Sequence, residues 1–463
     1  MRRCARTTTG ARPADLLITG GMVVTMDSED RIFDEGAVAI SGERILAVGE
    51  ARTVARDITA RRVISARGKV VLPGLINAHT HAPMTLFRGL ADDLDLQRWL
   101  ADYIFPAEKQ VVTRSFVYWG TLLACLEMLQ GGITTFADMY YFEEEVARAV
   151  DRAGMRAVVG QTILDLPSPD SPTSEQGLRR AERLIRAWRG HRRVTPAVAP
   201  HAIYTSSPKT LQATRQLADK YGVPLLLHLA ETEQEVVETE RRHGARPIAY
   251  LDRLGVLGER LVAAHVVHVT DDELALLQRR RVGVAHNPQS NMKLGSGVAP
   301  VTRMVRAGVA VGLGTDGAAS NNALDLFTEM KVAALLQKVH QGDPQALTAS
   351  EALRMATRLG ARALGLEAEI GSLEVGKMAD LILVNMTAPH QIPLYNVISQ
   401  LVYACKPSDV GMVIVGGKIV MAERRVLTVP EAELRRQVER LRRQVCRRLG
   451  LSPGKASHRE REF

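Results

Sequence analysis

Two histidines, His79 and His81, are separated by a single residue and lie just after an apolar run, residues 70–76. In an extended strand, side chains two residues apart point to the same side. Both imidazoles would therefore aim at one point beyond the C-terminal end of the strand, which is how a chain offers two ligands to one metal ion. A His-x-His pair alone is weak evidence, because such pairs occur by chance on protein surfaces.

Three more residues of ligand type each lie at the end of a short apolar run. They are His228, His265 and Asp316. Such runs are typical of strands that are buried on both faces. A single buried histidine or aspartate has an ordinary structural explanation, but repetition at several strand ends favours one shared metal site.

The elements that would position these side chains are short apolar segments separated by longer helical patterns. The eight strand candidates are residues 70–78, 132–139, 155–164, 194–200, 223–228, 261–265, 282–286 and 309–314. This alternation predicts an α/β fold, a closed (β/α)8 TIM barrel, whose active site lies at the C-terminal strand ends. An open doubly wound sheet would need a Gly-rich dinucleotide loop after its first strand, and none follows it.

Outside the barrel, both ends of the chain contain short strand patterns separated by turn residues. They are residues 16–21, 37–40 and 44–49 on one side, and 379–384 and 413–420 on the other. We expect a small composite β-sandwich domain assembled from residues 1–72 and 367–430, with the barrel inserted as residues 73–366.

The formal net charge of +9 comes from the two ends. Residues 1–14 carry four arginines and no acid, and residues 431–463 carry ten Lys or Arg against five acids. The rest sums to zero, so we expect no nucleic-acid partner and no membrane partner. An apolar stripe recurs at spacings of three and four: Leu434, Val438, Leu441, Val445 and Leu449. It predicts a basic amphipathic helix and tail over residues 431–463.

The composition is that of an ordinary globular enzyme, with 46% apolar and 24% charged residues. No apolar run approaches the roughly 18 residues that a membrane-spanning helix needs, and no apolar h-region follows the N-terminal arginines, so a cytoplasmic location is expected. The four cysteines show no C-x-x-C spacing. Any metal must therefore be held by nitrogen and oxygen, which excludes the nucleobase deaminases with cysteine-bound zinc.

Several motifs together resemble the amidohydrolase superfamily, in particular its branch of methylthioadenosine/S-adenosylhomocysteine deaminases and related chlorohydrolases. They are Pro73–His81, Phe105–Glu108, His228–Thr232, Ala264–His265, Ser290–Gly297, Gly314–Asn322 and Gly371–Asp380. The resemblance covers about residues 15–425.

This resemblance implies one divalent metal ion, for which Zn²⁺ is the leading expectation and Fe²⁺ the alternative. Its expected ligands are His79, His81, His228 and Asp316. Binuclear relatives carry a bridging carboxylated lysine at the end of the fourth strand. Residues 194–200 contain no lysine, so a single ion is expected.

The resemblance also implies three catalytic residues. Glu231 would protonate a ring nitrogen and pass a proton to departing ammonia, Asp316 would take the proton of the attacking water, and His265 would orient that water. Ordinary alternatives are a solvated acid for Glu231 and a packed core histidine for His265.

For the substrate, the resemblance places Glu108 and His201 at ribose hydroxyls, Glu231 at the purine ring nitrogen, and Ser320 beside that ring. Each of Glu108, His201 and Ser320 also has an ordinary structural explanation. Residues 160–178 contain no arginine for the carboxylate of a homocysteine group. This absence shifts the expectation away from S-adenosylhomocysteine.

We therefore expect a metal-dependent hydrolytic deaminase, an aminohydrolase acting on C–N bonds of cyclic amidines. Its small-molecule substrate would be adenosine, 5'-deoxyadenosine or 5'-methylthioadenosine, converted to the inosine analogue plus ammonia, and the enzyme would be a homo-oligomer. The alternative is an amidohydrolase for another aminated or chlorinated N-heterocycle, of the guanine deaminase or triazine chlorohydrolase type. A catalytically inactive scaffold is a further alternative, but no expected ligand is missing.

Overall fold

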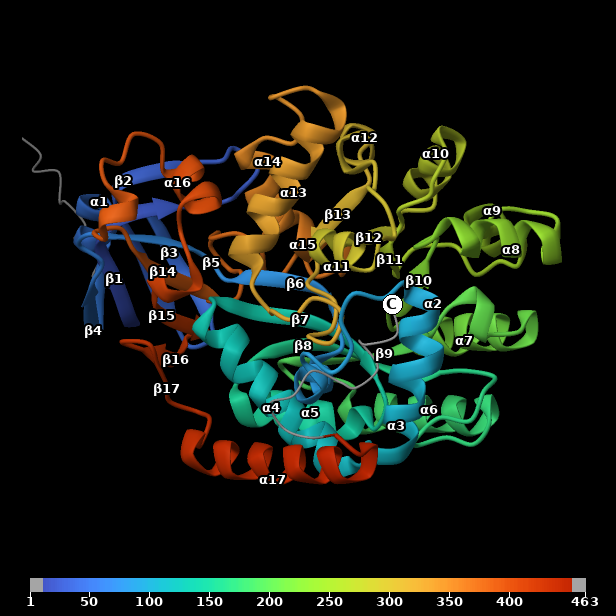
Figure 1. Ribbon diagram of the computed structural model, residues 1–463. Coiled ribbons are helices and arrows are strands. Elements are labelled where there is room, and N and C mark those ends of the chain that lie inside the picture. Colours follow the sequence, from blue (N-terminus) through green and yellow to red (C-terminus); the bar gives the residue numbers. More distant parts are fainter. Residues whose placement is uncertain (1–10, 452–463) are drawn as a thin grey trace, which may run out of the picture.

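The computed structural model describes residues 11–451 and contains two sheets (Figure 1). One is an eight-stranded sheet in the order β13-β12-β11-β10-β9-β8-β7-β6. Its strands are β6 (Leu75–Thr80), β7 (Ile133–Tyr140), β8 (Arg156–Ile163), β9 (Val194–Pro200), β10 (Leu225–Leu229), β11 (Leu261–His265), β12 (Gly283–His286) and β13 (Ala310–Leu313). Neighbouring strands are parallel. Each overlaps a predicted segment, so the predicted (β/α)8 architecture is confirmed.

The first and last strands of this sheet meet and close it. The N–H of Asp316, just after β13, donates to the carbonyl of His79 in β6 over 3.0 Å. Every residue of β7 and β8 is buried, because barrel side chains on one face of the sheet and helices on the other exclude water. This double burial explains why the strands are continuous apolar runs.

Helices surround the barrel. They are α4 (Arg114–Gln130), α5 (Glu143–Ala153), α6 (Ser174–Trp188), α7 (Pro208–Tyr221), α8 (Glu233–His243), α9 (Pro247–Arg253), α10 (Asp271–Arg279), α11 (Pro288–Lys293), α12 (Val301–Arg306), α13 (Leu326–Gln341), α14 (Ala349–Met355) and α15 (Arg358–Ala363). Seven of them, α4, α6, α7, α8, α10, α13 and α14, begin after a Thr, Ser or Asp whose side chain accepts a backbone N–H. Such caps satisfy otherwise unpaired donors.

The predicted first strand, residues 70–78, is wrong as a single element. Residues Lys69–Pro73 form β5 of the other sheet, and the barrel strand begins only at Leu75. Gly74 separates them, and a Cβ there would lie 2.1 Å from the Thr134 hydroxyl oxygen. Both strands are buried, so the apolar pattern continues where the chain passes from one sheet to the other. Only Gly74 marks this point.

The second sheet combines both ends of the described chain, in blue and red in Figure 1. Its order is β17-β16-β15-β14-β5-β1-β2-β3, and β4 pairs with β1. These strands are β1 (Arg12–Val24), β2 (Ile32–Ser41), β3 (Arg44–Glu50), β4 (Ile58–Ser65), β5 (Lys69–Pro73), β14 (Leu381–Asn385), β15 (Val410–Val415), β16 (Lys418–Ala422) and β17 (Arg425–Val426). Leu16, Ile40 and Leu383 belong to one apolar cluster between strands of the two ends. On the other face, Leu17 packs with Val54 of α1 (Ala51–Asp57).

Two details of this sheet were not predicted. Residues 413–420 are a hairpin of β15 and β16 that turns at Gly416 and Gly417, both with positive φ. Strand β4 was missed because its burial pattern is mostly exposed, so it carries little hydrophobic signal. Short helix α16 (Val397–Tyr403) lies between β14 and β15 in the chain.

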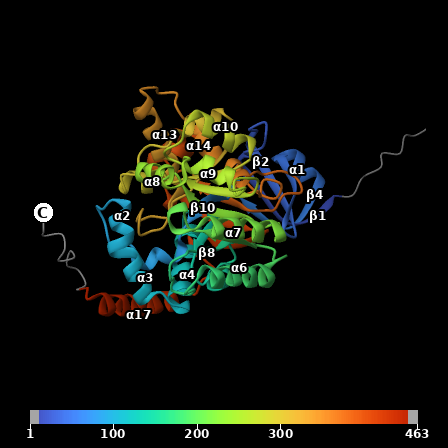
Figure 2. The same ribbon diagram turned by 90° about the vertical axis from the view of Figure 1, so that its right-hand side faces the viewer.

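The last described helix, α17 (Glu431–Leu449), lies along α3 (Phe105–Val111) and α4 (Figure 2). Leu434, Leu441 and Val445 of the apolar stripe are buried. Residues 1–10 and the tail beyond 451, where part of the basic charge falls, lie outside the described residues. Among residues 11–451, no helix is both long and apolar enough to span a bilayer.

Candidate metal and catalytic site

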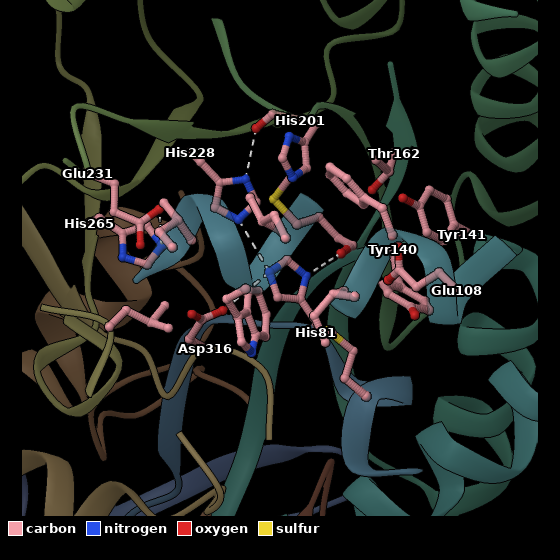
Figure 3. Close-up of a pocket in the computed structure, with 18 of the residues that line it drawn as sticks. His81, Glu108, Tyr140, Tyr141, Thr162, His201, His228, Glu231, His265 and Asp316 are labelled. Carbon is pink, nitrogen blue, oxygen red and sulfur yellow. Dashed lines mark hydrogen bonds and ion pairs between the residues drawn. The ribbon is translucent and has the colours of Figure 1, made fainter. Parts of the chain in front are cut away.

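One pocket opens at the C-terminal ends of the barrel strands (Figure 3). It encloses about 560 Å³, including space open to solvent. Seven residues predicted for the site line it: His81, Glu108, His201, His228, Glu231, His265 and Asp316. Of the other two, His79 is buried within the histidine cluster behind the lining, with ring centroids 4.9 Å from His81, and Ser320 lies outside the lining.

The predicted metal ligands converge on one point. The Oδ1 atom of Asp316 lies 3.4 Å from Nε2 of His79 and 3.2 Å from Nε2 of His81. Nε2 of His81 lies 3.2 Å from Nε2 of His228. The donor atoms of His79, His228 and His265 also lie within 4.8 Å of one another, so the geometry alone admits His265 as a further neighbour.

The donor chemistry of these side chains fits a divalent cation. The Nδ1 atoms of His81 and His228 face the carbonyls of Met139 and His201 at 2.6 and 2.8 Å. A carbonyl only accepts, so each Nδ1 donates and each neutral ring presents the lone pair of Nε2 to the centre. Among the described residues, Nε2 of His79 has no hydrogen-bond partner. One cation would satisfy these converging lone pairs together with the Asp316 carboxylate.

Without the cation, the ionisation of the cluster is unequal. Burial lowers the pKa of His79 to about 4. Burial opposes protonation of His81 too, but the hydrogen bond and charge of Asp316 raise the pKa of His81 to about 9. Burial alone would raise the pKa of Asp316, yet the close approach of both histidines holds it well below its usual value. Without a cation the cluster therefore carries an ionised carboxylate beside a charged imidazole, and a bound cation would displace the proton of His81.

Sharp backbone turns aim the site residues. Ala230, His265, Val266 and Asp316 all have positive φ, between 48° and 73°. This left-handed conformation is uncommon for residues other than glycine and is maintained only by surrounding structure. Here the carbonyl of Ala230 accepts N–H groups of the loop after β11, from residues 267 and 268, at 2.9 and 3.0 Å.

Glu231 and His265 lie close together on one side of the pocket. Nε2 of His265 lies 3.8 Å from Oε2 of Glu231. Its Nδ1 lies 2.8 Å from Oδ1 of Asn291, and the hydroxyl of Ser296 donates to Oε1 of Glu231 over 3.3 Å. Burial raises the pKa of Glu231. A carboxyl group with a raised pKa keeps its proton to a higher pH than an exposed one, which suits a proton carrier.

Ser320 is not among the described residues that line the pocket. Its hydroxyl donates to Oδ2 of Asp316 over 2.8 Å, and the Ser290 hydroxyl donates to the same oxygen over 2.6 Å. Ser320 follows Asp316 by four residues in a tight turn, so its side chain returns to the carboxylate. The hydrogen bonds of Ser290, Asn291 and Ser296 to Asp316, His265 and Glu231 were not predicted, although all three belong to the motif Ser290–Gly297.

Glu108 and His201 line the part of the pocket away from Glu231 (Figure 3). Glu108 belongs to α3 (Phe105–Val111) and is buried. Burial raises the pKa of Glu108 to about 7, although the hydroxyls of Tyr140 and Tyr141 oppose this rise. Burial, with the neighbouring His81 and His79, lowers the pKa of His201 to about 3, so its imidazole is neutral.

An apolar wall completes the pocket. It comes from α2 (Leu96–Arg98), a π-helical turn (Trp99–Ile104) and α3. Its lining side chains are Leu96, Trp99, Leu100, Ile104 and Phe105. No lysine or arginine is among the described residues that line the pocket. Apart from Phe105, which belongs to the motif Phe105–Glu108, the residues of this wall were not predicted.

Comparison with known proteins gives a family and close relatives. A sequence model of the amidohydrolase family matches residues 70–420. A protein of Syntrophobacter fumaroxidans named 5-methylthioadenosine/S-adenosylhomocysteine deaminase is 52% identical over 436 residues, which cover 94% of this chain and 99% of that protein.

Solved structures are similar over nearly the whole chain. An adenosine deaminase from Xanthomonas campestris with bound zinc has a TM-score of 0.92 and 41% identity, covering 94% of this chain and 99% of that one. An atrazine chlorohydrolase from Arthrobacter aurescens complexed with zinc has a TM-score of 0.85 and 25% identity, covering 92% and 100%.

Proposed function

The chain belongs to the amidohydrolase family, and we propose that it is a hydrolytic deaminase of adenosine-type nucleosides that releases ammonia and the inosine analogue. It is a hydrolase acting on C–N bonds of cyclic amidines. The observation that carries this function is one pocket lined by members of the His/Asp cluster, the buried acid Glu231, and Glu108 and His201. The relatives of greatest identity reported above are named as deaminases.

We propose Zn²⁺ as the metal, held by His79, His81, His228 and Asp316. The converging nitrogens and single carboxylate suit this ion, and the similar Xanthomonas campestris enzyme was crystallised with it. When bound, such an ion supplies a water of lowered pKa and so a nucleophile at neutral pH.

In the proposed reaction, Asp316 deprotonates the attacking water and His265 orients it. Oδ2 of Asp316 accepts two serine hydroxyls and Oδ1 accepts the N–H of Gly317, which fixes the carboxylate. We propose that this carboxylate accepts the proton of the water as it adds to C6. If Nδ1 of His265 donates to Asn291, its Nε2 is free to accept a hydrogen bond from the same water and orient it.

Glu231 is proposed to act on the other reactant. It gives its proton to the adjacent ring nitrogen, which makes C6 a better electrophile, and then helps return a proton to the amino group so that ammonia departs. Its raised pKa and its position 3.8 Å from His265 support this role. Water contributes one oxygen to the product, and its two hydrogens are distributed between ring nitrogen and ammonia.

Glu108 and His201 are proposed to bind the ribose hydroxyls. A carboxylate accepts hydrogen bonds from both hydroxyls of a diol, and a neutral imidazole can donate or accept one. The wall around Trp99 and Leu100 is apolar, and the described residues that line the pocket include no lysine or arginine. This chemistry favours an uncharged 5' group, as in 5'-methylthioadenosine, over the charged amino acid of S-adenosylhomocysteine.

A panel of substrates tests this function. Purified metal-loaded protein is incubated with adenosine, 5'-deoxyadenosine, 5'-methylthioadenosine and S-adenosylhomocysteine, with guanine and a chlorotriazine as the competing classes, while ammonia or chloride is measured. We expect ammonia from the first three nucleosides, and a lower kcat/KM for S-adenosylhomocysteine. Turnover of guanine or the triazine without any adenosine derivative would overturn the proposal.

A further inference from the structure

Glu235 is a buried carboxylate that binds the backbone of the proposed proton carrier. It is 3% exposed and occupies the third position of α8. Oε2 accepts the backbone N–H of Glu231 over 2.8 Å, and Oε1 accepts that of Ala230 over 3.1 Å. Among the described residues, no lysine or arginine forms an ion pair with it. Its carboxylate oxygens are thus paired with the N–H groups of Ala230 and Glu231, the two residues that precede the cap residue of α8.

This arrangement differs from ordinary helix capping. Thr232 caps α8, and its hydroxyl accepts the N–H of Glu235 over 3.2 Å. In a capping box, the glutamate at the third position returns the bond to the N–H of the cap residue. The pairs Thr270–Glu273 and Thr348–Glu351 of this chain do so. Glu235 instead accepts the N–H groups of the two residues before the cap residue, Ala230 and Glu231.

The turn that Glu235 holds sets the direction of the Glu231 side chain. Ala230 has a φ of 51°, a conformation that an alanine rarely adopts unless other contacts enforce it. Its carbonyl is held by the loop after β11, and its N–H by Glu235. Together these bonds place the Glu231 carboxyl beside His265 and Ser296.

We propose that Glu235 is a positioning residue for proton transfer: it holds the N–H groups of Ala230 and Glu231 and thereby aims the Glu231 carboxyl at the reacting ring. This inference rests on the proposed function, in which Glu231 moves the protons. Glu235 does not line the pocket, so it acts only through Glu231.

The substitution Glu235→Gln tests this role. The amide keeps the size of the side chain, but it has only one acceptor oxygen for two N–H groups. For adenosine and 5'-methylthioadenosine we expect kcat to fall about tenfold or more, with KM within about threefold, because a small misplacement of a reacting group costs rate rather than binding. Zinc content should equal that of the wild type.

Glu351→Gln is the matched control. Glu351 also occupies the third position of a Thr-capped helix, α14, but it bonds only to its own cap residue, Thr348. Loss of one capping bond there should leave kcat and KM within about twofold of the wild type. If Glu235→Gln behaves like Glu351→Gln, the proposal is overturned.

A double substitution separates positioning from a general structural effect. In the Glu231→Gln background, Glu235→Gln should reduce kcat by no more than about twofold, because the group that Glu235 positions is already lost. If the two substitutions instead lower kcat by independent factors that multiply, the proposal is contradicted. If Glu235→Gln folds poorly, Glu235→Asp keeps the charge but shortens the reach, and a wild-type kcat for it would overturn the proposal.

A structural readout keeps this inference distinct from the proposed function. In a crystal structure of Glu235→Gln, the Glu231 carboxyl should leave its position beside His265 and Ser296, while the metal ligands stay in place. An unmoved Glu231 would overturn the positioning role. Absence of nucleoside turnover by the wild type would reject the function, whereas this readout needs no substrate.

Discussion

Glu231 is the residue on which proton transfer depends in the proposed reaction. Glu231→Gln keeps the size of the side chain and one acceptor but removes the proton that it delivers. We expect kcat to fall by about 10²–10⁴-fold, the range typical for loss of general acid–base catalysis. Metal content, measured by elemental analysis, should not change, because Glu231 is not among the proposed ligands. Turnover equal to that of the wild type would reject the role.

Glu108 gives the site a pH dependence with a definite sign. Its pKa is raised to about 7 by burial, so it is protonated below this pH and ionised above it. Only the ionised form accepts hydrogen bonds from both ribose hydroxyls. The KM for adenosine should therefore fall by up to about tenfold between pH 6 and pH 8. Initial rates across this range measure it, with Glu108→Gln as the comparison.

Glu108→Gln should have a higher KM that no longer falls with pH. The same pH trend in both proteins would show that another group controls binding. The change concerns KM, so it is separable from the kcat effect expected at Glu231.

At the level of elements, residues 288–296 support all three proposed catalytic groups. Ser290 bonds to Asp316, Asn291 to His265 and Ser296 to Glu231. These three groups come from different strand ends, so one short helix and its following loop tie together the catalytic side of the pocket.

Asn291→Ala tests this support. The change would leave Nδ1 of the buried His265 without its acceptor and free the ring to rotate. We expect kcat to fall about tenfold or more, with the bound metal retained. Met292→Ala, at an exposed position of the same helix, is the control and should resemble the wild type. Equal kcat values for the two variants would contradict the role of Asn291.

The sequence predicted the barrel strands better than the supports of the site. Buried parallel strands carry a strong signal, and ligands at their ends follow from the fold. The supporting serines and Asn291 are ordinary polar residues whose partners depend on loop geometry. The same limit explains why the contact of Ser320 was not predicted: its hydroxyl bonds to Asp316, and it is not among the described residues that line the pocket.

At the scale of the whole molecule, a buried ion pair joins the two sheets. Arg156 of β8 bonds to Asp380, next to β14, with Nε 2.8 Å from Oδ2. Their side chains are 8% and 3% exposed, and Asp380 also accepts the N–H of Gly416 over 2.7 Å. These bonds connect the barrel sheet to the second sheet. Asp380 belongs to the motif Gly371–Asp380, but its partner Arg156 is distant in sequence and was not predictable.

Asp380→Asn should destabilise the protein, because it leaves a buried arginine without its counter-charge. Breaking such a pair typically costs about 3–5 kcal/mol, so denaturant unfolding should show a clearly lower midpoint. Glu431→Gln, which breaks an exposed pair with Arg435, is the control and should change stability by less than about 1 kcal/mol. Equal midpoints for both variants would show that the buried pair does not join the sheets energetically.

The most direct test of the proposed function follows the oxygen of water into the product. Zinc-loaded protein is given 5'-methylthioadenosine in oxygen-18-labelled water, and the product mass and ammonia are measured. Hydrolytic deamination predicts the inosine analogue with one labelled oxygen and one ammonia per product, and neither from metal-stripped protein. Free adenine, an unlabelled product, or no turnover of any adenosine derivative would contradict it.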